Sequence, residues 1–373
     1  MTEYLMLTPG PTTTTPTVKQ SMLNDWSVLD SEYTNDIVKD VTTQLLSLAC
    51  CAKHSADYDC VLLPGNGNCA LESVLGSAIN KQHKLLLIDN GQSGQHMAHI
   101  CQNLGINTQY YRLSPAESPD ISHIDRILAG DSSITHVAFV HIEINSGLAN
   151  PIDALCQVIK QHQRRIIVDA NASFGGVELD LVALDIDYLI ANPSQCLQSI
   201  DGFSFVIAKN QAFERCQQHA HSHNLNLHRH WKNQQNLTAN HLDIHRFNAS
   251  PQIVASLQQA LIELDQEGGI SARALRYSVN QKLLAQGMLE QDFQPLVSKE
   301  QQSTVISAFY APNHKSYAFE HFYQLLKHQG YIIYPGAIDG IECFRIANIG
   351  HVYPADIKSL LVTIEKCRYW LRE

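Results

Sequence analysis

Residues 60–79 read CVLLPGNGNCALESVLGSAI, a short apolar run, a glycine-containing turn and a longer segment with apolar residues at helical spacing. This order predicts a strand, a tight turn and a helix. The same alternation continues along the chain, with strands expected at 84–89, 136–143 and 165–170, helices through 96–100 and over 152–163, and a strand, turn and strand over 187–208. Near-continuously apolar strands separated by helices are typical of a parallel sheet covered on both faces.

The last third of the chain has a different pattern. Residues 250–267 and 269–290 predict two long helices joined at Gly268-Gly269, followed by short strands and helices that suit a compact α+β domain. We therefore expect an α/β protein with a mainly parallel sheet between helices in its large domain. The expected parts are an N-terminal arm over residues 1–15, a large domain over 16–255 and a smaller C-terminal α+β domain over 256–373.

Length and composition agree with two domains and exclude several classes of protein. The chain has 373 residues, which exceeds the size of about 250–300 residues at which single domains stop growing. It is 45% hydrophobic and 17% charged, and no apolar stretch approaches the roughly 20 residues of a membrane helix. The net charge of −10 argues against a nucleic-acid partner. The N-terminus lacks the pattern of a secretory signal, so we expect a cytoplasmic protein.

The turn within residues 64–72, PGNGNCALE, is the first candidate binding site. Gly65 and Gly67 would let the backbone approach an anion, and free amides at the start of the following helix favour a phosphate. A short turn between a strand and a helix also needs glycine for its geometry alone, so both explanations stay open. Cys69 would have a lowered pKa if it lies at the helix start.

Three polar residues stand at the ends of two expected strands. Asp169 ends the strand in IIVDANASFGG (166–176), at the edge where open α/β sheets bind ligands. A buried carboxylate there needs a cationic partner, and the alternative is a helix cap or an ion pair within the loop. His141 and Glu143 hold the corresponding place after an earlier strand. One of them would stack on or hydrogen bond to a ring, unless the histidine is a core residue.

Arg345 is an isolated cation in the apolar segment CFRIANIG. Its planar guanidinium suits two hydrogen bonds to a carboxylate or phosphonate, and an ion pair between the domains is the alternative. A second unusual feature is the segment 219–245, which holds seven of the 19 histidines. No carboxylate or cysteine pattern completes a metal site there, so we expect none.

Motifs along almost the whole chain resemble those of a known family. They are LTPGPTTT, GNGNCALESVLGSA, DNGQSGQHM, HIEINSGLANPID, VDANASFGG, DYLI, EGGISAR, YIIYPG and FRIANIG. In this order they are similar to the class V aminotransferases, and most similar to the 2-aminoethylphosphonate–pyruvate transaminase branch. The resemblance implies the fold type I of enzymes that use pyridoxal 5′-phosphate (PLP), and a homodimer with each site at the subunit boundary. It also implies an amino acid or aminophosphonate and a 2-oxo acid as substrates.

The resemblance assigns roles to individual residues. Asp169 would pair with the pyridinium nitrogen of PLP, where its charge turns the ring into an electron sink. Arg345 would bind the acid group of a substrate. The remaining contacts with the cofactor phosphate and ring would come from Asn66, Gly67, Asn68, Ser93, Glu143 and Asn171.

One position departs from the family in a way that affects catalysis. The family lysine that joins PLP covalently corresponds to Gln195, in the turn after DYLI. A carboxamide nitrogen shares its lone pair with the carbonyl, so it neither forms that bond nor accepts the proton that the lysine moves. Ser93, Ile144 and Ala337 likewise replace a stacking aromatic, a hydroxyl and a lysine of the family.

These departures leave three hypotheses for function. The first is an aminotransferase that holds PLP without a covalent bond, or that forms half of a mixed dimer. The second is a binding or regulatory protein that holds PLP, its pyridoxamine form or another anion without turnover. The third is a partner subunit whose pocket has closed. Retention of Asp169 favours a bound ring with a basic nitrogen, whereas Ser93 removes a stacking contact.

Overall fold

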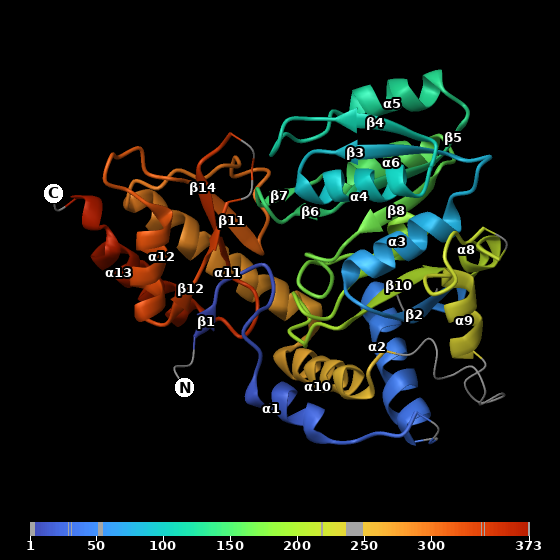
Figure 1. Cartoon of the computed structure of the whole chain (residues 1–373), viewed down its shortest axis with the longest axis horizontal. Coiled ribbons are helices and arrows are strands. Elements are labelled where there is room, and N and C mark those ends of the chain that lie inside the picture. The colour runs from blue at the N-terminus through green and yellow to red at the C-terminus, as the bar shows by residue number, and fades with distance from the viewer. Residues whose placement is uncertain are drawn as a thin grey trace.

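The computed structural model describes residues 4–371 apart from 29, 31, 51–54, 218, 236–248, 337 and 339. Its central feature is a seven-stranded sheet in the order β2-β10-β9-β8-β5-β3-β4 (Figure 1). The strands are β2 (Tyr58–Pro64), β3 (Lys84–Asp89), β4 (Thr108–Arg112), β5 (Ile134–Val140), β8 (Arg165–Asp169), β9 (Tyr188–Ala191) and β10 (Phe203–Lys209). β10 runs antiparallel to both of its neighbours, and the other pairs are parallel. The predicted mainly parallel sheet is confirmed.

Helices cover both faces of this sheet. Side chains of a strand point alternately to its two faces, so Leu86 and Ile88 of β3 enter one core cluster while Leu85 and Leu87 enter the other. One face is covered by α3 (Gly67–Ala78), α4 (Gln92–Asn103), α8 (Asn210–Arg215) and α9 (Leu227–Gln235). The other face is covered by α2 (Lys39–Ala49), α5 (Ile121–Gly130), α6 (Ile152–Gln161), α7 (Leu181–Leu184) and α10 (Pro251–Glu267). Burial on both faces explains the continuous apolar runs in the sequence.

The C-terminal part contains a smaller antiparallel sheet in the order β11-β14-β13. It is formed by β11 (Ile306–Tyr310), β13 (Tyr334–Pro335) and β14 (Cys343–Ala347), and it packs with α11 (Gly269–Glu290), α12 (Phe319–His328) and α13 (Pro354–Cys367). Near the N-terminus, β1 (Leu5–Met6) pairs in parallel with β12 (Tyr331–Ile332), before α1 (Pro16–Gln20) begins. The first described residues therefore lie against the C-terminal part of the chain (Figure 1).

The two predicted long helices are present as α10 and α11. They meet at Gly268 and Gly269, whose φ angles of 105° and 78° lie in the left-handed region that glycine adopts without strain. α10 packs against the core of the large sheet through Leu257 and Leu261, although the domain boundary predicted at residue 255 falls within it. The division into 1–15, 16–255 and 256–373 stays a prediction.

One strand differs from its prediction. Residues 136–143 form two elements, because β5 ends at Val140 and the chain continues into a hairpin of β6 (Ile142–Glu143) and β7 (Leu148–Ala149). Gly147, with a φ of 79°, makes the turn of this hairpin. None of the described helices is both long and apolar enough to cross a membrane.

Candidate functional site

A cavity of about 760 Å³ lies at the carboxyl ends of the strands of the large sheet. This is the edge where open α/β sheets bind ligands. Loops of the sheet form most of its lining, while Pro9, Gly10 and Pro11 come from the N-terminal segment, and Tyr334 and Arg345 come from the smaller sheet. The hypothesis of a closed pocket is therefore wrong.

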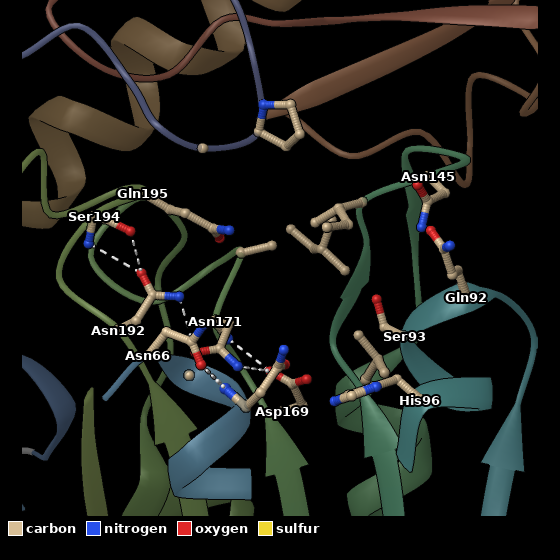
Figure 2. Close-up of a pocket in the computed structure, with 18 of the residues that line it drawn as sticks. Asn66, Gln92, Ser93, His96, Asn145, Asp169, Asn171, Asn192, Ser194 and Gln195 are labelled. Carbon is tan, nitrogen blue, oxygen red and sulfur yellow. Dashed lines mark hydrogen bonds between the residues drawn. The ribbon is translucent and has the colours of Figure 1, made fainter. Parts of the chain in front are cut away.

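Asp169, the last residue of β8, lies at the floor of the cavity (Figure 2). Its Oδ1 accepts hydrogen bonds from the backbone nitrogen of Asn171 at 2.9 Å and from Asn171 Nδ2 at 2.7 Å. Burial raises the pKa of Asp169 to about 6, although both hydrogen bonds act in the opposite direction. Neither a helix cap nor an ion pair with Asp169 is present in the described part of the chain. The cationic partner expected from the sequence is thus not among the described residues.

Side-chain amides connect Asp169 to the N-terminal segment (Figure 2). Asn192 Nδ2 donates to Asn171 Oδ1 at 3.0 Å, and Asn192 Oδ1 accepts from the nitrogen and Oγ of Ser194 at 3.0 and 2.9 Å. Thr12 Oγ1 then donates to the Ser194 carbonyl at 3.1 Å. These bonds fix which way each amide faces. Thr12, Asn192 and Ser194 were not predicted as site residues, although Thr12 belongs to the LTPGPTTT motif and the other two lie within three positions of residue 195.

The glycine turn between β2 and α3 brings Asn66, Gly67 and Asn68 to the cavity wall. The Asn66 side chain caps α3 by accepting a hydrogen bond from the Asn68 amide at 3.2 Å. A Cβ added to Gly67 would lie 2.6 Å from Asn171 Cγ, so this position requires glycine for close approach. The expected lowering of the Cys69 pKa is wrong, because burial raises the pKa of this thiol more than the amide of the helix start lowers it.

Ser93 and Glu143 are joined by hydrogen bonds next to the cavity, although only Ser93 lines it. Ser93 lines the cavity, and its backbone nitrogen and Oγ each donate to the Glu143 carboxylate at 3.0 Å. Glu143 is fully buried, and it also accepts two hydrogen bonds of 3.3 Å from Asn145. Glu143 lines a neighbouring cavity of about 100 Å³. A Cβ on Gly91 would lie 2.5 Å from Glu143 Cγ, which makes glycine necessary there.

Arg345 reaches the cavity from β14. Its Nε donates to the Pro335 carbonyl at 3.0 Å, and its Nη1 donates to Asn145 Oδ1 at 2.5 Å and to the Ile144 carbonyl at 3.4 Å. Within the described ranges no carboxylate forms an ion pair with Arg345, and Nη2 has no protein partner. The guanidinium is thus held in place by Nε and Nη1, and Nη2 is left to donate to a ligand.

Gln195 points into the cavity from the turn after β9 (Figure 2). Its Oε1 is buried and has no hydrogen-bond partner among the described residues. Of those described residues that line the cavity, none is a lysine. Lys209 ends β10, where its Nζ donates to Asp185 Oδ1 at 2.6 Å. Ala337, where the resemblance implies a family lysine, lies outside the described residues.

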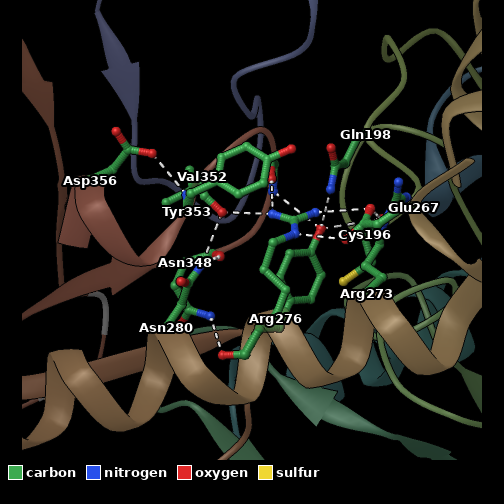
Figure 3. A network of polar contacts seen from close by, with 12 residues as sticks. Cys196, Gln198, Glu267, Arg273, Arg276, Asn280, Asn348, Val352, Tyr353 and Asp356 are labelled. Carbon is green, nitrogen blue, oxygen red and sulfur yellow. Dashed lines mark hydrogen bonds and ion pairs between the residues drawn. The ribbon is translucent and has the colours of Figure 1, made fainter.

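The turn that carries Gln195 is anchored by α11 (Figure 3). The Cys196 carbonyl accepts hydrogen bonds from Arg273 Nη1 at 3.0 Å and from the Tyr277 hydroxyl at 3.4 Å. Arg273 is buried, and its Nε donates to Glu267 Oε2 at 2.9 Å. From the sequence, Arg273 is recognisable only as part of the EGGISAR motif. The anchor makes the position of the glutamine a fixed feature of the fold.

Of the histidines that the structure describes, only the exposed His96 lines this cavity. His141 is a core residue, because its Nδ1 lies 2.9 Å from Ser173 Oγ and burial lowers its pKa to about 4. Part of the histidine-rich segment, including His241 and His245, lies outside the described residues. Across the rest of the chain, as far as it is described, no group of three or more His, Cys, Asp or Glu could hold a metal ion.

Known proteins share the family and the fold of this chain. Residues 55–346 match the family model for class-V aminotransferases. A 2-aminoethylphosphonate–pyruvate transaminase from Vibrio vulnificus is 45% identical over 368 residues, covering 99% of this chain and 98% of the relative. A transaminase of the same name from Klebsiella pneumoniae is 43% identical over 98% of both chains.

Solved structures show the same fold. The ureidoglycine–glyoxylate aminotransferase of Bacillus subtilis has a TM-score of 0.88 at 20% identity, with 98% of this chain and 92% of that chain covered. The pyridoxamine–pyruvate aminotransferase of Mesorhizobium loti has a TM-score of 0.88 at 19% identity, with 100% and 94% covered. With the family model matched over most of the chain and relatives above 40% identity over nearly all of it, this protein belongs to the class V aminotransferase family.

Proposed function

We propose that this chain transfers an amino group from an aminophosphonate to pyruvate, the reaction for which its relatives are named, with PLP held by non-covalent contacts alone. The observation that carries the proposal is Asp169. A buried carboxylate without a cation among the described residues is costly to keep, and a protonated ring nitrogen would supply the missing charge. A cavity that bound no such ring would gain nothing from this carboxylate.

The residues present fit this cofactor. Asn66, Gly67 and Asn68 stand at the start of α3, where backbone amides and the helix dipole favour a phosphate group. Arg345 offers Nη2 to the acid group of a substrate. When bound, PLP would supply the electron sink that makes a proton on the neighbouring substrate carbon labile.

Gln195 limits what the chain can do with that proton. Residue 195 has no basic nitrogen, and the cavity has no lysine among its described lining residues. Proton transfer by a positioned base is commonly worth about 10²–10⁴-fold in rate. We therefore expect amino transfer to be slower than in lysine-containing members of the family by at least about 10²-fold.

A second candidate function is binding without turnover. The lysine-free lining favours it, because an amide at residue 195 still contacts a ligand although it performs no proton transfer. In this case the chain holds PLP or its pyridoxamine form as a ligand, alone or beside an active subunit. We also propose that the chain acts in the cytoplasm as a homodimer, and that its substrates are small molecules.

Restoring the lysine separates the two candidates. Amino exchange is measured with excess PLP for the wild type, for Gln195→Lys and for Gln195→Met, a matched control with a similar shape and no base. Amino transfer predicts exchange by the wild type above the rate of free PLP, and a gain of at least about 10²-fold in Gln195→Lys but not in Gln195→Met. Exchange no faster than free PLP in the wild type would contradict the first candidate, and an active Gln195→Lys would then support the second.

A further inference from the structure

Gln195 carries a buried polar atom for which the protein supplies no partner. The atom is Oε1, an acceptor, and no donor reaches it within the part of the chain that the structure describes. A Cβ built on Gly10 would lie 3.8 Å from both Cγ and Nε2 of Gln195, so the amide end of the side chain lies beneath the N-terminal segment. Turning the amide over would exchange an unpaired acceptor for an unpaired donor. A buried polar group in this position is unfavourable until a ligand satisfies it.

The neighbouring donors are already used. Asn171 Nδ2 donates to Asp169, Asn192 Nδ2 donates to Asn171, and both donors of Ser194 bond to Asn192 Oδ1. These side chains form one chain of hydrogen bonds, in which each donates to the next and the last acceptor is the Asp169 carboxylate. None of them is free to turn toward Gln195, so a donor group on a bound molecule would satisfy Oε1.

The charges around the cavity favour a donor that is also a cation. Asp169 and Asp201 both line it, and Arg345 is the only lysine or arginine in the described lining. Arg345 is bonded to Asn145, which Figure 2 shows on the side of the cavity opposite Gln195. An ammonium group beside Gln195 could therefore donate to Oε1 without repulsion from Arg345.

The aldehyde and amine forms of the cofactor differ in the group that they would place beside Gln195. The aldehyde oxygen of PLP only accepts hydrogen bonds, whereas the ammonium of pyridoxamine 5′-phosphate (PMP) donates three and carries a charge. A lysine would favour the aldehyde by bonding to it covalently, and a glutamine gives no such preference. We infer that the cavity binds PMP in preference to PLP, with the buried Oε1 of Gln195 accepting a hydrogen bond from the PMP amine. This inference rests on the proposed function, because it concerns the same cavity.

Calorimetric titration tests the preference without any measurement of turnover. PMP and PLP are titrated separately into cofactor-free wild type, Gln195→Met and Gln195→Lys. We expect the wild type to bind PMP at least about tenfold more tightly than PLP, because a charged hydrogen bond to Oε1 contributes about that factor or more and the aldehyde oxygen cannot make one. Gln195→Met keeps the size of the side chain and removes the acceptor, so the two affinities should converge. Gln195→Lys should bind PLP more tightly than PMP.

Two results would overturn the inference: a wild type that binds PLP at least as tightly as PMP, or a Gln195→Met variant that keeps the wild-type preference. Comparable binding of both ligands would leave the proposed function in place and remove only the amine preference. Failure of the wild type to bind either ligand would remove both. Circular dichroism of each variant confirms that a lost preference is not a lost fold.

Discussion

Replacing Asp169 by asparagine should stabilise the cofactor-free protein, because it removes a buried charge and keeps the shape of the side chain. Burial raises the pKa of Asp169 from 3.8 to about 6. The folded chain therefore holds this proton more tightly than the unfolded chain, so the free energy of unfolding falls as the pH rises from about 4 to about 6 and stays at the lower value above pH 6. At about 1.36 kcal/mol for each tenfold change in the acid constant, the full penalty is about 3 kcal/mol. Asp169→Asn avoids it, since the side-chain oxygen of the new amide can still accept from Asn171.

The size of this gain depends on pH with a definite sign. At pH 8 the variant should be more stable than the wild type by up to about 3 kcal/mol, and at pH 5 by about half of that, because the folded wild type is then mostly protonated. The gain should vanish near pH 3.5, where the unfolded carboxyl is mostly protonated as well. Urea unfolding curves of the cofactor-free proteins at these pH values measure it. Adding PLP at pH 8 should stabilise the wild type and leave Asp169→Asn unchanged.

A matched control is Asp201→Asn, which changes an exposed carboxylate in the lining of the same cavity. Its unfolding free energy should stay within about 0.5 kcal/mol of the wild type at every pH. Equal stability of Asp169→Asn and the wild type at pH 8, or a gain that does not change with pH, would refute the reasoning. Either result would mean that ionisation of the buried Asp169 does not destabilise the folded protein.

Two further substitutions test the frame of the site. Arg273→Met removes the buried donor to the Cys196 carbonyl, and it should lower the free energy of unfolding by about 2 kcal/mol in urea, since Arg276 still pairs with Glu267. An unchanged free energy of unfolding would show that the hydrogen bond from Arg273 to the Cys196 carbonyl is not needed for stability. Gly67→Ala should displace Asn171 and weaken PLP binding by about tenfold in a fluorescence titration, because the hydrogen bond from Asn171 Nδ2 to Asp169 is lost. Wild-type affinity in this variant would contradict the close packing of the turn.

Local patterns were sufficient to predict most elements of the fold. The strand expected at 84–89 is β3 with the same limits, and the helices expected at 250–267 and 269–290 agree with α10 and α11 to within a residue. The strand expected at 136–143 is divided, because the apolar run continues through a turn into the hairpin of β6 and β7. Periodicity does not detect such a change of direction, and the available signal was Gly147.

The candidate site was predictable only where its residues lie in one motif. Asp169 and Asn171 are two residues apart at the end of a buried strand, so their contact can be predicted from the sequence. The hydrogen bonds from Thr12 to Ser194 and from Arg273 to Cys196 join residues 182 and 77 positions apart, and no local pattern links them. The unpaired Oε1 of Gln195 depends on these distant contacts, and it could be found only in the folded structure.

The most direct test of non-covalent cofactor binding at this site is an absorption spectrum and intact mass of the wild type with stoichiometric PLP, before and after borohydride reduction. Gln195→Lys, treated in parallel, serves as the positive control for a covalent adduct. We predict that gel filtration of the unreduced wild type retains PLP, and that the reduced wild type has the mass of the polypeptide alone. A wild-type mass increased by one reduced cofactor would contradict this, because another lysine would then bind PLP covalently in place of residue 195.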